Sequence, residues 1–419
     1  MLRIRVKRDL RQIVPPGRQW ALRTPSHMPT YNDLGHGDPP GGTVLAPVPA
    51  EQRVQVVHGG YMQSIDIPAR DFGTRMQAIR TTRPRAGVAG VGSYLPSRVV
   101  LNAEVEQRLA SARGDGRPTL RARTIERRSG VRQRHYIDPS DDASDLAVRA
   151  ARVALDDAGL GPEDIDLLIF ASASQDLIEP ATAHIVNAKL GGRATVFDVK
   201  NACNSFLNGM QIADALTQTG QHRRVLVCTG EAPSMGVRWA MGDGHMMKES
   251  FVGYTLGDAG AAVVLDARTD RTGITSVEFR AASEHWELCT LQGGGTRHLR
   301  DLDQLYFRGH GTALRNAFIQ WGAGELKEMV AATGTDYGDY DAILVHQVTG
   351  PLFETFLDVT GIDPEKTVRV IETLGNVASA SLPIQLGYSR RTGKVGDGAR
   401  VLMIGLGAGV SIGLLGLQL

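Results

Sequence analysis

Short apolar runs alternate with longer helix-like segments from Ala86 to the last residue, and this alternation constrains the fold more than any other feature. Apolar runs bounded by turn residues predict buried strands, and amphipathic segments that end at a glycine predict helices. In the first part of this stretch the predicted strands are 86–92, 166–171, 195–199 and 224–229, and the predicted helices are 102–110, 144–158 and 203–219. Such alternation is typical of an α/β fold in which helices cover a largely parallel sheet.

The pattern then repeats along the chain. The run that starts at Asp341 echoes the run that starts at Asp166, an offset of 175, and the run at Arg400 echoes the run at Arg224, an offset of 176. We therefore expect two similar halves, 83–265 and 266–419, packed as one layered body. Because open α/β sheets bind ligands outside the carboxyl ends of their strands, we expect a site where corresponding strand ends meet.

Residues 1–82 lie outside this pattern. They hold nine of the 19 prolines and eleven basic against six acidic residues, without sustained periodicity. We interpret them as a weakly ordered, Pro-rich basic extension. Two alternatives stay open. The segment is either upstream sequence from a start site placed too early, with Met76 as an internal candidate, or a basic docking arm.

Charge and cysteine content exclude several classes of protein. The 46 Lys and Arg residues nearly balance the 45 Asp and Glu residues, so the chain lacks the broad positive charge of a nucleic-acid-binding protein. Three cysteines cannot form a disulfide scaffold in a chain this long, which favours a reducing cytoplasm. Residues 401–419 carry no charge, but their five glycines favour two core strands joined by a turn over a membrane span. No paired Cys/His pattern indicates a metal site.

Three residues are candidates for chemistry, and each has a plainer alternative. Cys203 opens the predicted helix 203–219, where unpaired backbone N–H groups and the helix dipole favour a thiolate nucleophile; the alternative is a small buried side chain. His346 follows the predicted strand 341–345, although a lone histidine is more often structural. Asn376 lies in a turn before an apolar helix, where a helix cap or an Asx-turn is the alternative.

Together these residues resemble the Cys-His-Asn set of β-ketoacyl-acyl-carrier-protein synthase III, of the thiolase superfamily. The resemblance covers about residues 86 to 419, in order and without large gaps. The segments that carry it are Asp-Val-Lys-Asn-Ala-Cys at 198–203, His346-Gln347, Gly375-Asn376, Gly-Val-Gly-Ser-Tyr-Leu-Pro at 90–96, Arg-Ser-Gly-Val-Arg-Gln-Arg-His at 128–135, Leu-Gly-Asp-Ala-Gly-Ala-Ala at 256–262 and the glycine loop 405–413.

The resemblance implies a five-layered αβαβα fold built from two duplicated halves, and usually a homodimer. It also implies a ping-pong acyltransferase that needs no metal or organic cofactor. Cys203 takes the acyl group from an acyl-CoA or acyl-carrier-protein thioester in this scheme, with the backbone N–H groups of Cys203 and Ala408 as the oxyanion hole. His346 and Asn376 then stabilise the enolate that forms when a malonyl thioester loses carbon dioxide and condenses with the acyl group.

By the same resemblance, Arg128, Gly309 and Thr349 are the expected substrate-binding residues. The chain also departs from the family at several positions. Thr124 stands where initiation enzymes have an adenine-stacking tryptophan, Thr349 replaces an asparagine that contacts the pantetheine arm, and Pro351 replaces an arginine at the tunnel mouth. Ala408 replaces a glycine, and its N–H serves equally if its φ is allowed.

These departures keep two alternatives open. In the first, the acyl group passes from the cysteine to a hydroxyl, an amine or a second acyl unit without malonyl decarboxylation. In the second, the chain is a non-catalytic partner subunit that retains the fold.

Overall fold

The computed structural model describes residues 51–58, 61–68, 84–113, 119–121, 123–240 and 244–419. The chain divides into two compact units, Met1–Thr74 and Arg75–Leu419. In the first unit, strands β1 (Glu51–His58) and β2 (Tyr61–Pro68) pair as an antiparallel hairpin. This hairpin is regular structure that the pattern of residues 1–82 did not predict, and the rest of that predicted extension lies outside the described residues.

The second unit contains two larger sheets, each drawn from one part of the chain. The first sheet has the strand order β3 (Arg85–Tyr94), β9 (Ala259–Arg268), β8 (Arg224–Glu231), β6 (Leu167–Ala171) and β7 (Thr195–Val199). The second has the order β10 (Gly273–Ala281), β15 (Ser411–Gln418), β14 (Arg400–Gly407) and β13 (Ala342–Val345). The predicted boundary at 265/266 falls inside β9, the last strand of the first sheet along the chain. The chain passes from the first sheet to the second in the turn between Arg268 and Gly273.

The repeat seen in the sequence is also present in the strand pairing. β6 pairs in parallel with β8, with Leu167 opposite Val225, and β13 pairs in parallel with β14, with Ala342 opposite Val401. These two pairs are related by the offsets of 175 and 176 found in the sequence. Next to each parallel pair lie two antiparallel strands, β9 and β3 in the first sheet and β15 and β10 in the second.

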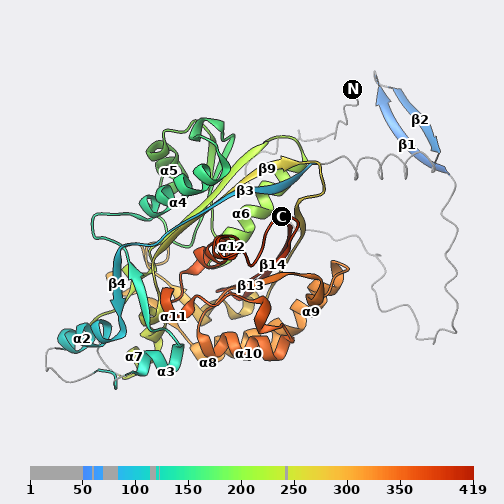
Figure 1. Cartoon of the computed structure of the whole chain (residues 1–419). Coiled ribbons are helices and arrows are strands. Elements are labelled where there is room, and N and C mark those ends of the chain that lie inside the picture. Colours follow the sequence, from blue (N-terminus) through green and yellow to red (C-terminus); the bar gives the residue numbers. More distant parts are fainter. Residues whose placement is uncertain (1–50, 59–60, 69–83, 114–118, 122, 241–243) are drawn as a thin grey trace, which may run out of the picture. The chain divides into compact units, whose positions relative to one another are not determined.

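Helices and sheets alternate in five layers (Figure 1). Three apolar cores separate the layers: one under the first outer helices, one between the two sheets, and one under the second outer helices. The first outer layer is α4 (Ala143–Ala158) and α5 (Thr182–Leu190), the middle layer is α6 (Ser205–Gln218) and α12 (Ser381–Arg391), and the second outer layer is α8 (Gly311–Ala317), α9 (Ala323–Ala332) and α10 (Gly350–Thr360). The predicted αβαβα arrangement is confirmed.

Smaller elements extend this body at the side where the sheets' parallel strands end. A satellite core holds together β4 (Arg98–Leu101), α2 (Asn102–Arg113), α3 (Thr124–Ser129), β5 (Gln133–Tyr136) and α7 (Gly244–Ser250). A short hairpin, β11 (Cys289–Leu291) with β12 (Phe307–Gly309), and the single-turn α11 (Ile371–Leu374) complete the structure.

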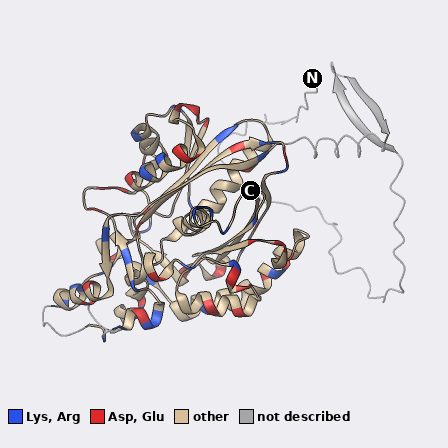
Figure 2. Cartoon of the chain, viewed as in Figure 1, with Lys and Arg blue, Asp and Glu red and all other residues tan. Residues whose placement is uncertain are grey.

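Charged side chains are distributed differently over the helical layers and the sheets. Figure 2 shows Lys, Arg, Asp and Glu interspersed on the outer helices, whereas the two sheets are largely free of charge. The uncharged C-terminal stretch forms the buried strands β14 and β15, as the glycines predicted. Within the described ranges, the search for a helix long and apolar enough to cross a membrane finds none.

Candidate active site

Cys203 lies in a tight turn between β7 and α6. Ala202 just before it has a left-handed backbone with φ of 48°, which is rare for a residue with a Cβ. Ser205 stabilises this turn, because its Oγ accepts from Asn201 N (2.8 Å) and donates to Ala202 O (2.7 Å). Helix α6 begins at Ser205, so Cys203 precedes the helix by two residues instead of opening it.

Two backbone N–H groups point at the Cys203 sulfur, that of Ala408 and that of Cys203 itself. Ala408 follows β14 in the turn to β15, and it is absent from the residues with positive φ, so alanine fits there without strain. Asn204 holds the two turns together, since its Nδ2 donates to Ser411 Oγ (2.9 Å) and O (3.2 Å). The structure thus brings together the two N–H groups that were expected to form an oxyanion hole.

Two effects in the structure act against the thiolate that was expected at Cys203. Burial raises the pKa of the Cys203 thiol, and the negative charge of Glu231 raises it further. The N–H groups of Ala408 and Cys203 act in the opposite direction but do not outweigh burial. In the free protein Cys203 is therefore held as a thiol, which must lose its proton when it reacts.

His346 follows β13 and donates its backbone N–H to Ile404 O (2.8 Å), in continuation of the parallel pairing with β14. The side chain is 1% exposed, and neither ring nitrogen has a hydrogen-bond partner among the described residues. Burial lowers the pKa of His346 from 6.5 to about 4, so the imidazole is neutral near pH 7. A neutral, unpartnered imidazole can accept one hydrogen bond and donate another to a ligand.

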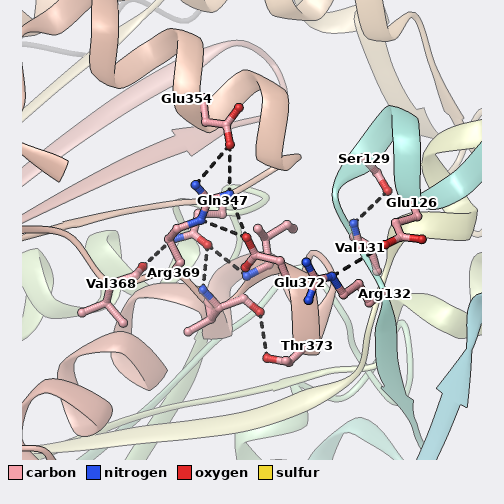
Figure 3. A network of polar contacts seen from close by, with 12 residues as sticks. Glu126, Ser129, Val131, Arg132, Gln347, Glu354, Val368, Arg369, Glu372 and Thr373 are labelled. Atoms are coloured by element: carbon pink, nitrogen blue, oxygen red, sulfur yellow. Dashed lines mark hydrogen bonds and ion pairs between the residues drawn. The ribbon is translucent and has the colours of Figure 1, made fainter. Parts of the chain in front are cut away.

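Gln347, the residue after His346, is bound through its side chain to the segment 368–371 (Figure 3). Its Oε1 accepts from Val370 N (2.9 Å) and Ile371 N (3.0 Å), and its Nε2 donates to Val368 O. The Gln347 side chain thereby ties the end of β13 to the segment that precedes α11. His346 is therefore held at a fixed point of the second sheet.

The backbone of Asn376 is held by the segment that precedes β9. Asn376 N donates to Thr255 O (2.9 Å), and Gly257 N donates to Asn376 O (3.1 Å). The carboxamide Oδ1 accepts from Ala378 N (3.0 Å), which is the Asx-turn considered as an alternative. Because Oδ1 is occupied, Nδ2 is the atom free to donate to a ligand, and no described residue accepts from it.

Arg134 links this segment to the satellite core. Its guanidinium is fully buried and donates to Tyr254 O (2.9 Å) and Asn102 Oδ1 (2.7 Å). Gly257 and Gly375 both lie directly against the Arg134 side chain, at points where a Cβ would meet backbone oxygen within 3 Å. The two turns that surround Asn376 therefore rest on Arg134.

Cys203, His346 and the loop that carries Asn376 each lie where a parallel strand of one of the two sheets ends. Cys203 follows the carboxyl end of β7 and meets Ala408 beyond the carboxyl end of β14. The loop that carries Asn376 meets the carboxyl end of β8, because Ser379 N and Oγ both donate to Glu231 Oε1. This is the position that the repeat and the strand-end argument predicted.

The expected substrate-binding residues lie on three segments near these ends. Gly309 in β12 pairs with Cys289 in β11, and Cys289 is close enough to Cys203 to raise the pKa of that thiol. Arg128 is exposed in α3, with its guanidinium 5.7 Å from the ring centre of Phe251.

Thr349 starts α10, where its Oγ1 accepts from Leu352 N (3.3 Å). The turn after Arg128 packs against the first residues of α10, since a Cβ on Gly130 would lie 3.3 Å from the Cα of Gly350. Arg128 and Thr349 are therefore on adjoining segments.

Glu231 and Ser379 are site residues that the sequence analysis missed. Glu231 is fully buried and Ser379 is 1% exposed. The sequence offers one indication of each residue. Glu231 is a charged residue that ends the apolar strand β8, and Ser379 lies 176 residues after Cys203, which is the offset of the repeat.

These features define a class of protein: a thiolase-like fold with a cysteine facing two N–H groups, a neutral imidazole and a carboxamide, suited to acyl transfer. No group of three His, Cys, Asp or Glu side chains in the described part of the chain is placed to hold a metal ion.

Comparison with known proteins specifies the family. The family described as 3-oxoacyl-[acyl-carrier-protein] synthase III matches residues 197–283, and its C-terminal domain matches residues 330–419. β-Ketoacyl-[acyl-carrier-protein] synthase III from Rhodospirillum rubrum is 32% identical over 341 residues, which cover 78% of this chain and 98% of the relative. The enzyme of the same name from Desulfitobacterium hafniense (strain Y51) is 29% identical over 334 residues, which cover 78% and 96%.

Solved structures agree. OleA from Xanthomonas campestris with cerulenin bound has a TM-score of 0.72 at 27% identity, covering 81% of this chain and 99% of that one. The 3-oxoacyl-[acyl-carrier-protein] synthase III from Aquifex aeolicus has a TM-score of 0.69 at 26% identity, covering 80% and 100%. The chain belongs to the β-ketoacyl-acyl-carrier-protein synthase III family and is an acyltransferase of that type.

Proposed function

We propose that this chain is a 3-oxoacyl synthase that works in two half-reactions. An acyl group passes from a thioester to Cys203, and the acyl-enzyme then undergoes decarboxylative Claisen condensation with a malonyl thioester. The observation that carries the proposal is the pair of N–H groups, from Ala408 and Cys203, directed at one sulfur in a turn between two sheets.

In the first half-reaction the sulfur of Cys203 attacks the thioester carbonyl. The thiol proton has to leave as the bond forms, and a neutral imidazole such as that of His346 suits its transfer to the departing thiolate. The carbonyl oxygen becomes an oxyanion at the position of the two N–H groups, which need no reorganisation to stabilise it. Coenzyme A or a carrier protein leaves as a thiol, and the acyl group stays on Cys203.

In the second half-reaction the malonyl thioester carbonyl accepts hydrogen bonds from His346 and from Asn376 Nδ2. Both donors are neutral, so they stabilise the developing enolate oxygen without protonating its carbon. Loss of carbon dioxide leaves the electron pair on that carbon, which attacks the acyl carbonyl. Collapse of the resulting tetrahedral oxyanion releases Cys203 and the 3-oxoacyl thioester.

The substrates proposed here are acyl-CoA or acyl-carrier-protein thioesters together with a malonyl thioester, and the acyl carrier protein is the proposed partner. Arg128, Gly309 and Thr349 are the proposed contacts to the thioester arm. Their segments adjoin the strand ends at which Cys203 lies. A cytoplasmic location is proposed because Cys203, Cys228 and Cys289 are all free thiols.

A homodimer is proposed from the edge of the first sheet. β7 is the edge strand, and Leu177 and Ile178 nearby are 50% and 62% exposed. An uncovered strand edge with exposed apolar groups favours association with a second copy. Light scattering after size-exclusion chromatography should give twice the mass of the chain, and a monomer at micromolar concentration would contradict this part of the proposal.

A second candidate function keeps the acyl-cysteine but omits the malonyl decarboxylation, passing the acyl group to a hydroxyl, an amine or a second acyl unit. Two observations favour it: Thr124 and Pro351 replace residues expected for coenzyme A recognition, and OleA structures, one with lauric acid and lauroyl-CoA bound, are as similar to this chain as synthase III structures.

Carbon dioxide release separates the two candidates. Purified protein is incubated with a panel of acyl-CoA donors, with and without malonyl thioesters of coenzyme A and of carrier protein. The proposed function predicts an acyl adduct and release of carbon dioxide that depends on both substrates. Acylation of the protein without carbon dioxide release favours the second candidate.

Two variants test the assigned roles. Cys203→Ala should abolish acyl loading, because no other described thiol meets both N–H groups. His346→Ala should reduce condensation more than loading, and equal losses of both steps would contradict its role in the second half-reaction.

A further inference from the structure

The nucleophile turn has a copy in the second half of the molecule. Ala202, with φ of 48°, has its counterpart in Ala378, with φ of 46°, and the two are 176 residues apart. The helices that follow, α6 and α12, begin at Ser205 and Ser381, again 176 residues apart. Ser379 therefore occupies the position in the second half that Cys203 occupies in the first.

The two turns reach across the molecule in opposite directions. Cys203 of the first half meets Ala408, beyond the end of β14 in the second half. Ser379 of the second half meets Glu231, at the end of β8 in the first half. The approximate symmetry of the two halves thus places a serine and a carboxylate where the reacting site has a cysteine and a backbone N–H.

This second turn is closed to substrate. Ser379 Oγ bonds to Glu231 Oε1 (2.5 Å), Thr229 Oγ1 (2.8 Å) and Ala171 O (3.2 Å), and Ser379 N donates to Glu231 Oε1 (3.3 Å). Both Ser379 and Glu231 are essentially unexposed. A hydroxyl that is shielded from solvent and whose single proton is directed at Glu231 and Ala171 O does not act as a second nucleophile.

Glu231 is itself fixed at several points. Its Oε1 also accepts from Ala173 N (2.8 Å), and its Oε2 accepts from Ser174 N (3.2 Å) and Ser174 Oγ (2.9 Å). These donors lie just after β6. Glu231 therefore joins the ends of β6 and β8 to the turn that contains Ser379.

A short path leads from this pair to Asn376. Ala378 stands between Asn376 and Ser379, and its N–H donates to Asn376 Oδ1 (3.0 Å). A left-handed backbone is unfavourable for a residue with a Cβ and persists only where surrounding contacts impose it. The bonds from Ser379 to Glu231 supply such contacts, and they therefore set the direction in which Asn376 Nδ2 points.

We infer that Ser379 and Glu231 are positioning residues for the condensation half-reaction, and that they act by holding the Asn376 carboxamide in its donating orientation. The inference deepens the proposed function and rests on it for the role of Asn376. It assigns no function to the pair in acyl loading, which uses Cys203 and the N–H of Ala408.

Glu231 has a second, separable effect on the site. After burial, the groups that raise the pKa of the Cys203 thiol are Glu231 at the end of β8 and Cys289 in β11, and Glu231 is the carboxylate of the two. Removing the charge of Glu231 should therefore ease ionisation of Cys203, whereas removing the Ser379 hydroxyl should not. This difference distinguishes the two members of the pair.

The experiment compares Ser379→Ala, Glu231→Gln and the control Ser389→Ala with the wild-type chain. Ser389 is as buried as Ser379 and lies in α12, but its hydroxyl has no hydrogen-bond partner among the described residues. Three quantities are measured: the single-turnover rate of Cys203 acylation by acyl-CoA, carbon dioxide release from malonyl thioester by the acyl-enzyme, and the pH dependence of Cys203 alkylation by iodoacetamide. Thermal unfolding confirms that each variant is folded.

Ser379→Ala should slow carbon dioxide release by about 10-fold or more, since a small displacement of a donor has a large kinetic effect, and leave acylation unchanged. Glu231→Gln should slow carbon dioxide release as well and shift Cys203 alkylation to lower pH. Ser389→Ala should match the wild type in all three measurements. The inference is overturned if Ser379→Ala releases carbon dioxide at the wild-type rate, or if it slows acylation and release equally.

If the wild-type protein is acylated but releases no carbon dioxide, the proposed function fails and the inference is decided by a crystal structure of Ser379→Ala. A carboxamide of Asn376 that has rotated away from Ala378 N supports the positioning role. A carboxamide that keeps its 3.0 Å bond contradicts it.

Discussion

At the scale of single residues, burial controls the chemistry of this site more than proximity to a helix does. The helix-dipole argument predicted a thiolate at Cys203, but Cys203 lies before the helix, and burial and the charge of Glu231 both raise the pKa of its thiol. His346 shows the same influence with the opposite sign, because a base that loses water favours its neutral form. Both groups are thus uncharged before substrate arrives.

The buried imidazole predicts a pH dependence of stability. Between about pH 6.5 and about pH 4 the unfolded chain binds a proton at this histidine and the folded chain does not, so the unfolding free energy falls as the pH falls. The loss over this window is about 3 kcal/mol. His346→Gln should remove it, and His184→Gln, at an exposed histidine, should not.

The measurement is urea unfolding of the wild type and both variants at several pH values. The difference between variants is needed because Asp258, whose pKa burial raises from 3.8 to about 6, contributes in the opposite direction over part of the same range. Parallel stability curves for the wild type and His346→Gln would show that His346 is protonated in the folded protein.

At the scale of elements, the closeness of helix and sheet depends on glycines. Helix α4 lies directly on the first sheet, where a Cβ on Gly92 would be 2.1 Å from Ala150 O and one on Gly230 would be 1.8 Å from Ala143 O. The sequence predicted the helix and the strands correctly, but not this contact. The reason is that a glycine in a strand indicates a close approach without identifying the element that approaches.

Gly92→Ala tests this packing. The added methyl group has no room against the α4 backbone, so the substitution should destabilise the fold by about 3 kcal/mol. Gly324→Ala is the matched control, because Gly324 lies in α9 with nothing within 4 Å of the added Cβ. That change should leave stability unchanged or raise it by about 0.5–1 kcal/mol. Equal midpoints of thermal unfolding for the two variants would exclude the close contact.

The start of α10 explains two departures from the family pattern at the same scale. Thr349 caps the helix through its hydroxyl, and Pro351 occupies the first turn, where its missing N–H has no cost. The residues that replace an expected asparagine and arginine thus serve helix initiation.

At the scale of the whole molecule, the internal repeat was the most informative feature of the sequence. Offsets of 175 and 176 predicted two related halves, and the strand register reproduces them. The site could be predicted as far as single residues that follow strands, such as Cys203 and His346. The Glu231–Ser379 pair could not, because contacts across the two halves depend on packing that periodicity does not encode.

The division into two compact units predicts that the first is dispensable for the chemistry. Cys203, His346 and Asn376 all lie in the unit Arg75–Leu419. A chain that begins at Arg75 should fold, unfold at the same temperature as the full chain and load acyl groups at the same rate. Loss of acyl loading in a folded truncated chain would show that residues 1–74 contribute to the site.

The central claim is that Cys203 carries the acyl group, and peptide mapping tests it most directly. The protein is incubated with an acyl-CoA donor, digested, and analysed by mass spectrometry before and after addition of a malonyl thioester. The account predicts one acyl adduct on the peptide that contains Cys203, which disappears when the malonyl thioester is added. An adduct on Cys228, Cys289 or no cysteine, while Cys203 stays free under every donor, would contradict it.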